Sequence, residues 1–266
     1  MEEPSVALNH HTSRFDWRAR GRAAGIHFGI SLGVAAVAAL LVFALWYPYP
    51  YREVSGGREL FLLVVAVDVI LGPLITFAIF NRAKGWPHLR RDLAVVGLLQ
   101  LAGLGYGLWT VHLARPVHLV FEIERFRVVH AVDIPVDLLD QVPAGIEAMP
   151  LGGPTPLAVR PFRNEKEKMD ATMVALQGIA LAARPDLWQT YEAAKPAILQ
   201  AAKPVSTLKT RFPAQAAEVD AVLQRGNRNA ASAVYLPMIA RKATAWTVLL
   251  DAGTAEIIGF VPLDSF

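Results

Sequence analysis

The sequence predicts a membrane protein with three transmembrane α-helices followed by an extracytoplasmic α+β domain with an antiparallel sheet. Two observations predict this class. Apolar residues make up 54% of the 266 residues and charged residues only 18%, against roughly 45–50% and about 25% in an average soluble domain. The apolar excess lies almost wholly before residue 115, whereas residues 115–266 have the composition of an ordinary globular domain.

Three long apolar stretches predict the membrane helices. Residues 23–51 and 93–114 contain no charged side chain, and residues 60–81 contain one, Asp68. Each stretch exceeds the roughly 20 residues that a helix needs to cross about 30 Å of hydrocarbon. The first is too long for the core of a signal peptide and lacks a small-residue cleavage site, so we expect it to remain as an anchor. The expected helices run over about 26–47, 60–80 and 93–114, in a bundle over 26–114.

Basic residues near these stretches predict the orientation. Four arginines precede the first span, among them Arg14, and the loop at 81–92 carries four basic residues, among them Arg82 and Lys84. The loop at 52–59 has two arginines offset by two glutamates. Because basic segments stay in the cytoplasm, we expect a cytoplasmic tail over 1–25 and an exported domain over 115–266.

The exported domain shows strand signals at both ends and helix signals between them. Residues 117–133 predict one or two strands, and a proline-rich stretch over 143–161 predicts an irregular connection. Three closing runs predict strands, with a hairpin turn from Asp251 to Thr254 before the last. Strands, helices and strands in this order favour helices on one face of an antiparallel sheet. The closing runs are 234–240, 245–250 and 256–261.

Three helices are expected in the middle of this domain. Asn164 and Glu167 form a cap pair that opens a helix ending near residue 183. Pro185 suits the start of a second helix, ending near residue 194 or 202, which Pro196 would kink or end. A third is expected from residue 213 to residue 225, with Gly226 just past its end.

Asp68 stands out within the predicted bundle. A carboxylate in the middle of a span is costly unless it faces protein or water, or is protonated. Pro73 removes the hydrogen bond that the carbonyl of Val69 would accept, so a polar side chain and a freed carbonyl share one turn. Asp68 either contacts a helix of another protein or is bound internally to Gln100 or Tyr106 of the third span. A proton relay is not expected, because no second carboxylate lies in the spans.

Small residues predict close contacts between helices. Glycines recur every four residues in the first span, at 21, 25, 29 and 33, and the third span has a similar patch at 103, 105 and 107. Such smooth faces let another backbone approach closely. One interpretation packs these two helices together, and the other docks a client helix or a second copy of the chain. The residues expected at the contact are Asp68, Gly72, Pro73, Thr76, Gly25, Gly29, Gly33, Gln100, Gly103 and Gly107.

The sequence offers little for catalysis or metal binding. It has no cysteine, which excludes disulfides, thiolate ligands and cysteine nucleophiles. Ser206 and Lys209 form an S-x-x-K pattern without its companion motifs, which we attribute to chance. His118 and His130 lie on expected strands, but two histidines without carboxylates make a weak metal site. We expect no catalytic residue, metal or cofactor, and the net charge of +3 is too small to indicate nucleic-acid binding.

An ordered set of short motifs resembles one known family. The first span closes with Leu-Trp-Tyr-Pro-Tyr-Pro at 45–50, and the second carries Asp68 and Gly72-Pro73 inside one hydrophobic run. Together these motifs resemble the TfpX/TfpZ group of type IV pilin accessory proteins. Residues 143–232 carry little that matches. The other motifs are Gly25-Ile-His27, Phe80-Asn81, Asp92-Leu93, Leu99-Gln-Leu101, Tyr106-Gly107, Arg115-Pro-Val117, residues 242–247 and residues 259–264.

The resemblance implies an inner-membrane protein with a periplasmic domain that assists a particular pilin during pilus biogenesis and is not an enzyme. We expect the bundle to hold the hydrophobic helix of the cognate type IV pilin, with Asp68 and the glycine faces in contact. Residues 115–266 would bind the periplasmic head of the pilin. Membrane lipid is a further expected partner, and the glycine faces also allow self-association.

Two other functions compete with this one. A membrane-anchored sensor or regulatory protein would bind a ligand in its periplasmic domain, but the expected cytoplasmic parts are only a short tail and a twelve-residue loop. A subunit of an envelope enzyme or transporter would need convergent polar groups, and Asp68 is the one carboxylate in the expected spans.

Overall fold

The computed structural model describes residues 16–81, 85–242 and 245–266. Arg14, Arg82 and Lys84, which support the expected orientation, lie outside these residues, as do Ala243 and Thr244 of the motif at 242–247. The chain divides into two compact units. One contains residues up to Val37 together with Leu62–Gly107, and the other contains Ala38–Phe61 together with Leu108–Phe266.

Three long apolar helical segments are candidate membrane spans, by length and composition: Trp17–Trp46, Gly57–Ile79 and Trp86–Leu113. Each begins several residues before the predicted start, because flanking arginines and other good helix formers continue the helix into polar sequence. The first segment is α1 (Trp17–Leu41) with a π-helical turn, η1 (Val42–Trp46), and the third is α5 (Trp86–Leu113). The second consists of α3 (Gly57–Ala66), the π-helical turn η2 (Val67–Leu71) and α4 (Gly72–Ile79).

The second unit is built on a mixed sheet, so the prediction of an antiparallel sheet was wrong. The strand order is β4-β3-β1-β2-β6-β7-β8, with β5 also paired to β6. β1 pairs in parallel with β3, and β2 in parallel with β6, while the other pairs are antiparallel. The strands are β1 (Pro116–Glu122), β2 (Arg125–His130), β3 (Thr155–Val159), β4 (Trp188–Thr190), β5 (Lys203–Pro204), β6 (Ala233–Ile239), β7 (Trp246–Asp251) and β8 (Ile257–Val261).

The prediction of an antiparallel sheet failed at β3 and at the pairing of β2 with β6. β3 lies inside the proline-rich stretch, and Pro156 stands opposite Leu119 of β1. β2 and β6 are more than 100 residues apart, and no local pattern sets the direction in which two such strands meet. The strands at both ends of the domain are where the sequence predicts them, including the β7–β8 hairpin.

The helices of this unit are α6 (Glu165–Leu176), α7 (Tyr191–Ala201), α8 (Val205–Arg211) and α9 (Ala216–Arg225). The cap prediction for α6 is confirmed, since Asn164 Oδ1 accepts a hydrogen bond of 2.8 Å from the Glu167 N–H. The predicted end near residue 183 was wrong. The predicted start of α7 at Pro185 was also wrong, because Thr190 caps that helix, but its predicted end near residue 202 is confirmed, and Pro196 lies inside it. α8 was not predicted, and α9 ends before Gly226 as expected.

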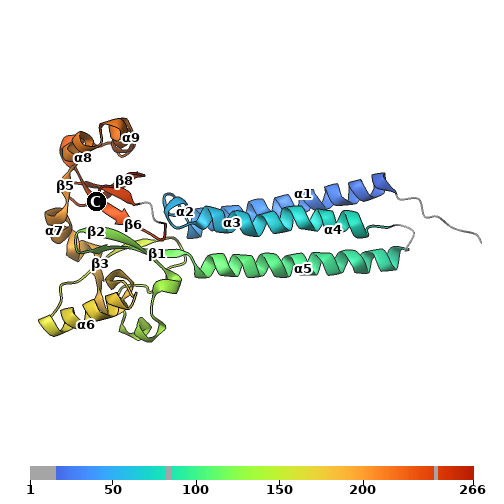
Figure 1. The fold of residues 1–266 in the computed structure, drawn as a ribbon, viewed down its shortest axis with the longest axis horizontal. Helices are drawn as coiled ribbons and strands as arrows, with labels where there is room; N and C mark the ends of the chain where they lie inside the picture. Colours follow the sequence, from blue (N-terminus) through green and yellow to red (C-terminus); the bar gives the residue numbers. More distant parts are fainter. Residues whose placement is uncertain (1–15, 82–84, 243–244) are drawn as a thin grey trace, which may run out of the picture. The chain divides into compact units, whose positions relative to one another are not determined.

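Helices cover both faces of the sheet, so the prediction of helices on one face was wrong. Along β6 the side chains alternate in the usual period of two: Tyr235 packs with α8 and α9, while Leu236 and Met238 pack in the core shared with α7. Figure 1 shows α8 and α9 at the β8 end of the sheet and α6 at the β3 end. The second core also includes Tyr51, from the short helix α2 (Tyr51–Val54) between the first two candidate spans.

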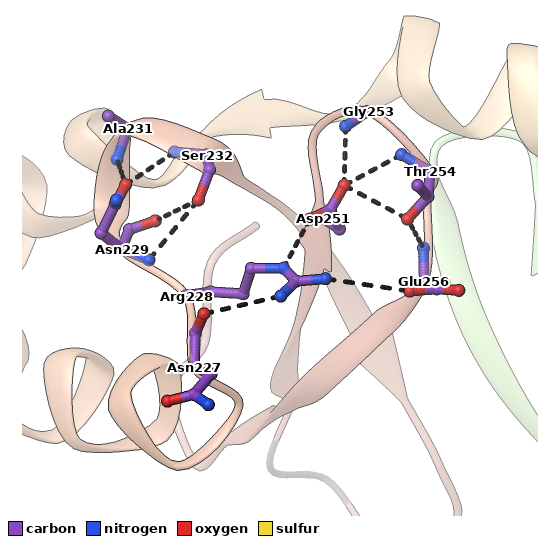
Figure 2. Close-up of polar contacts among 9 residues, drawn as sticks. All are labelled: Asn227, Arg228, Asn229, Ala231, Ser232, Asp251, Gly253, Thr254 and Glu256. Atoms are coloured by element: carbon purple, nitrogen blue, oxygen red, sulfur yellow. Dashed lines mark hydrogen bonds and ion pairs between the residues drawn. The ribbon is translucent and has the colours of Figure 1, made fainter.

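Six short 3-10 turns lie in the part of the chain that the structure describes. They are η4 (Ala131–Asp133), η5 (Val136–Gln141), η6 (Leu181–Ala183), η7 (Pro185–Leu187), η8 (Pro213–Gln215) and η9 (Ala230–Ser232), with the turn at Asp251 closing the β7–β8 hairpin. In Figure 2, Asp251 Oδ1 accepts hydrogen bonds from the N–H groups of Gly253 and Thr254, and its Oδ2 accepts one of 2.7 Å from Arg228 Nε. Arg228 thereby joins the α9–β6 connection to the hairpin.

Candidate functional site

The residues expected at a helix contact fall into three groups in the first unit. Gly72, Pro73, Thr76 and Gly107 are buried. Asp68 and Gln100 are half-buried. The remaining four, Gly25, Gly29, Gly33 and Gly103, are exposed. The expected set therefore divides into residues that build the bundle and residues that form its surface.

The π-helical turn η2 explains why Asp68 and Pro73 occur together. In a π-helix each carbonyl accepts from the N–H five residues on, and proline at position 73 has no N–H to offer the carbonyl of Asp68. The side-chain amide of Gln100 supplies the missing donor, with Nε2 at 3.0 Å from that carbonyl oxygen. The freed carbonyl predicted at Val69 is thus the carbonyl of Asp68. The predicted bond of Gln100 to this turn is present, but it goes to the main chain and leaves the carboxylate out.

Two buried glycines make room for these helix contacts. A Cβ atom on Gly72 would lie 1.8 Å from Gln100 Nε2, and one on Gly107 would lie 2.4 Å from a methyl carbon of Val64. Both distances are far below contact distance. Gly107 therefore packs α5 against α3, and the interpretation that it packs against the first helix is not what the structure shows.

His27 and Arg20 make further cross-helix contacts that sequence reasoning missed. Nδ1 of His27 lies 2.5 Å from Oγ1 of buried Thr76. One guanidinium nitrogen of Arg20 donates to the carbonyls of Phe77 and Ala78, at 3.0 and 2.6 Å, where the last turn of α4 leaves carbonyls without helical partners. His27 was visible in the motif Gly25-Ile-His27, but nothing in the spacing pairs it with a residue 49 positions away.

The Asp68 carboxylate lines a cavity of about 200 Å³ in this unit. His27 and Ser31 of α1 and Gln100 of α5 contribute polar atoms to its lining, and Gly97 and several aliphatic side chains complete it. Within residues 16–81 and 85–107, no hydrogen bond or ion pair reaches the carboxylate oxygens of Asp68. A group that enters the cavity and donates a hydrogen bond would supply this partner.

The glycine face of α1 is open. A Cβ atom on Gly21, Gly25, Gly29 or Gly33 would have no atom within 4 Å, and the same is true of Gly103 and Gly105 on α5. In the described part of this unit the two glycine faces therefore do not pack against each other. The α1 stripe is thus an open surface of this unit.

The polar groups singled out in the second unit have structural partners. His118 is buried, with Nδ1 at 2.7 Å from Thr155 Oγ1 and Nε2 at 3.0 Å from the carbonyl oxygen of Ala148, and burial lowers its pKa to about 4. His130 binds Asp133 through Nδ1 at 3.0 Å. Lys209 Nζ contacts both carboxylate oxygens of Asp220 at 2.7 Å.

These partners give each of these motifs a structural role. The two histidines are bound to different groups, and the S-x-x-K lysine is held in an ion pair. Across residues 16–81, 85–242 and 245–266, no group of three or more histidine, aspartate or glutamate side chains is arranged to hold a metal ion.

Comparison with known proteins gives the family. Residues 15–56 match the family described as "Fimbrial assembly protein FimB". The "Fimbrial assembly protein, serogroup I" of Dichelobacter nodosus is 37% identical over 91% of this chain and 94% of its own length. The chain belongs to the fimbrial assembly protein family.

Other members of this family from Dichelobacter nodosus are also similar. The fimbrial assembly protein of serogroup E1 is 35% identical, with the same coverage of both chains. That of serogroups C1 and C2 is 42% identical over 45% of this chain and 88% of its own length. No solved structure matches the chain. As a member of the fimbrial assembly protein family, the chain has a role in the assembly of fimbriae, and the resemblance to pilin accessory proteins is confirmed at this level.

Proposed function

We propose that this protein is a multi-pass protein of the inner membrane that binds its cognate pilin and stabilises or presents it for assembly, without catalysing a reaction. Its N-terminus is cytoplasmic and residues 115–266 are periplasmic. The observation that carries the proposal is the similarity to fimbrial assembly proteins over 91% of the chain, in a protein with three candidate membrane spans.

The open glycine face of α1 supports a contact with a pilin helix. A pilin waits in the membrane on a hydrophobic N-terminal helix, and glycines at 25, 29 and 33 would let that helix approach closely. Association of helices in lipid depends on such close packing, because lipid is as apolar as the side chains. Within the first unit no atom lies within 4 Å of a Cβ added at these glycines, so binding there would displace no side chain of this unit.

The cavity at Asp68 supports a second, polar contact, separate from the packing on the glycine face. A carboxylate inside a membrane span favours a donor from a partner, because an unpaired polar group is costly in hydrocarbon. His27 of α1 and Gln100 of α5 line the same cavity. Residues 27, 30, 31 and 34 of α1 line this cavity, and at about 3.6 residues per turn they lie on the other side of the helix from glycines 25, 29 and 33. A donor group would therefore reach Asp68 through a second contact, separate from the glycine face.

Co-purification of pilin with the tagged full-length protein tests the proposal. We expect Gly29→Leu to lower pilin recovery several-fold, because the side chain would hold a partner helix away from α1. Asp68→Leu should lower it as well. Ala94→Leu is the matched control, since Ala94 is also exposed in an apolar helix but lies on α5, outside both glycine faces.

The possible results distinguish pilin binding from self-association of the chain. Unchanged recovery with Gly29→Leu and Asp68→Leu, in variants that insert and fold normally, would remove this surface from pilin binding. Loss of self-association without loss of pilin would assign the face to a second copy of the chain. Deletion of the gene should reduce surface pili, measured separately from total pilin. Unchanged piliation in a strain without a paralogue would contradict the role in assembly.

A further inference from the structure

The strand β8 lies at one end of the sheet in the second unit. It pairs with β7, from Val261 opposite Thr247 to Ile257 opposite Leu250, and with no strand on its other side in the described part of the chain. In an edge strand, half of the backbone N–H and C=O groups point away from the sheet. Those of β8 are therefore oriented to pair with a further strand.

The sequence of β8 has few of the features that protect sheet edges. Natural edges are usually blocked by charged residues, by proline or by very short strands, but β8 reads Ile-Ile-Gly-Phe-Val, with proline only after its end. A register shift lies opposite Leu249 and Leu250, and the pairs from Gly259 to Val261 are regular. At the other end of the sheet, β4 has only three residues.

A cavity of about 290 Å³ lies along this edge. Ile258, Gly259 and Phe260 of β8 form one side, and the end of α9 and the ring of Tyr49 form the rest. Tyr49 is 49% exposed. Extended peptides that add to a sheet edge are bound through main-chain hydrogen bonds and are selected by pockets for alternate side chains. The cavity has the position of such a pocket.

Arg225 supplies a cation to the cavity lining. It is exposed, and its guanidinium group donates to the carbonyl of Ala221 at 3.3 Å. No carboxylate lies within ion-pair distance of it in the described residues, whereas nearby Arg228 is paired with Asp251 (Figure 2). A positive side chain without a counter-charge favours an acidic group in whatever fills the cavity.

We propose that the edge of β8 binds an extended segment of a partner protein, which adds a strand to the sheet. The segment places an apolar side chain in the cavity beside Tyr49 and Phe260 and an acidic side chain at Arg225. This inference deepens the proposed function, because it gives the exported domain a surface for its partner. The β8 edge lies in a different unit from Asp68, so this inference and the proposed pilin contact at Asp68 can fail separately.

A synthetic peptide tests the proposal on the full-length protein in detergent. The probe is a fluorescent ten-residue peptide of alternating valine and threonine with one central glutamate, and binding is followed by anisotropy. We expect Arg225→Glu to weaken binding of the glutamate peptide at least about tenfold. A peptide with lysine in place of the glutamate should bind the Arg225→Glu protein more tightly than the glutamate peptide does. Lys166→Glu, the same charge change at another exposed helical position, is the matched control and should have no effect.

Strand pairing is tested by a second readout. Bound peptide should slow hydrogen exchange in residues 256–263, and N-methylation of alternate peptide amides should abolish binding. Unchanged exchange, or equal effects of Arg225→Glu and Lys166→Glu, would overturn the proposal. Protection of these residues in the protein alone, with concentration-dependent dimers, would overturn it in favour of a second copy. Normal peptide binding by Asp68→Leu, with loss of pilin recovery, would separate this surface from the bundle contact.

Discussion

A Cβ atom added to Gly72 would lie 1.8 Å from Nε2 of Gln100, the nitrogen that donates to the carbonyl of Asp68. Gly72 thus leaves the space through which a side chain of α5 reaches the main chain of the second candidate span. The donor, the acceptor and the space between them come from three separate positions. A substitution at any one of them should disturb the other two.

Gly72→Ala should lower the stability of the full-length protein by about 1–3 kcal/mol, because the added methyl group overpacks the contact and displaces Gln100. Thermal unfolding in detergent measures this. Gly105→Ala is the control, since the added methyl group meets no atom within 4 Å. An equal effect of the two substitutions would show that the Gln100 contact does not contribute to stability.

Glu122→Gln should destabilise the second unit by about 1–3 kcal/mol. The buried carboxylate accepts hydrogen bonds from Nε of Arg125 and of Arg127 and from the N–H of Ala182, at 3.2, 2.6 and 3.1 Å. An amide replaces one acceptor oxygen by a donor and removes the charge that both arginines face. Urea unfolding measures the loss. Glu124→Gln, at an exposed position two residues away, should change stability by less than about 0.5 kcal/mol.

The stability of the second unit should fall as the pH is lowered from 7 to 4. Burial lowers the pKa of His118 from 6.5 to about 4, so below pH 6.5 the unfolded chain binds a proton that the folded chain does not. Stability from this group is complete above pH 6.5 and is lost as the pH falls toward 4. The full loss is about 3 kcal/mol.

Urea unfolding between pH 4 and 7 tests this expectation. His118→Gln should flatten the pH dependence, although the variant will be less stable at pH 7. Burial also lowers the pKa of His130, so part of the dependence should remain. An identical slope in the variant and the wild type would mean that His118 does not titrate as described.

Asp251→Ala should destabilise the β7–β8 hairpin by about 1 kcal/mol. The hydrogen bond from Gly253 N–H and that from Arg228 hold the pKa of Asp251 at about 2, so the carboxylate is charged at neutral pH. Asp251→Asn should cost less, because its side-chain oxygen can still accept from Gly253 and Thr254. Hydrogen exchange at the hairpin amides measures the difference. Equal losses would mean that the turn bonds contribute nothing and the charge everything.

Local patterns predicted much of the secondary structure. The apolar stretches, the Asn164 cap and the Asp251 turn each depend on residues close in sequence, and all three are present. The predicted end of α6 and the predicted start of α7 at Pro185 were wrong, and the strand β3 was not predicted. In each case packing in the second unit outweighs local propensity, as at β3, where a proline pairs with β1.

In the candidate site too, the sequence predicted some of the residues but not the contacts that they make. Asp68, Gly72, Pro73 and Gln100 were singled out because polar, small and proline residues are unusual in an apolar span. The choice between a bond to the carboxylate of Asp68 and a bond to its main chain could not be made, because it depends on the π-helical turn. The contact between His27 and Thr76 could not be predicted, because it depends on the register of two helices.

The sequence by itself determined that this chain has three long apolar helices, a following region of mixed strands and helices, no thiol chemistry and a carboxylate within an apolar helix. These properties follow from composition and from the order of residues along the chain. The tertiary structure decided the parallel pairing of β1 with β3 and of β2 with β6, the partner of Gln100 and the openness of the α1 glycine face. Those properties depend on which distant surfaces come into contact, and that is set by the balance of packing over the whole unit.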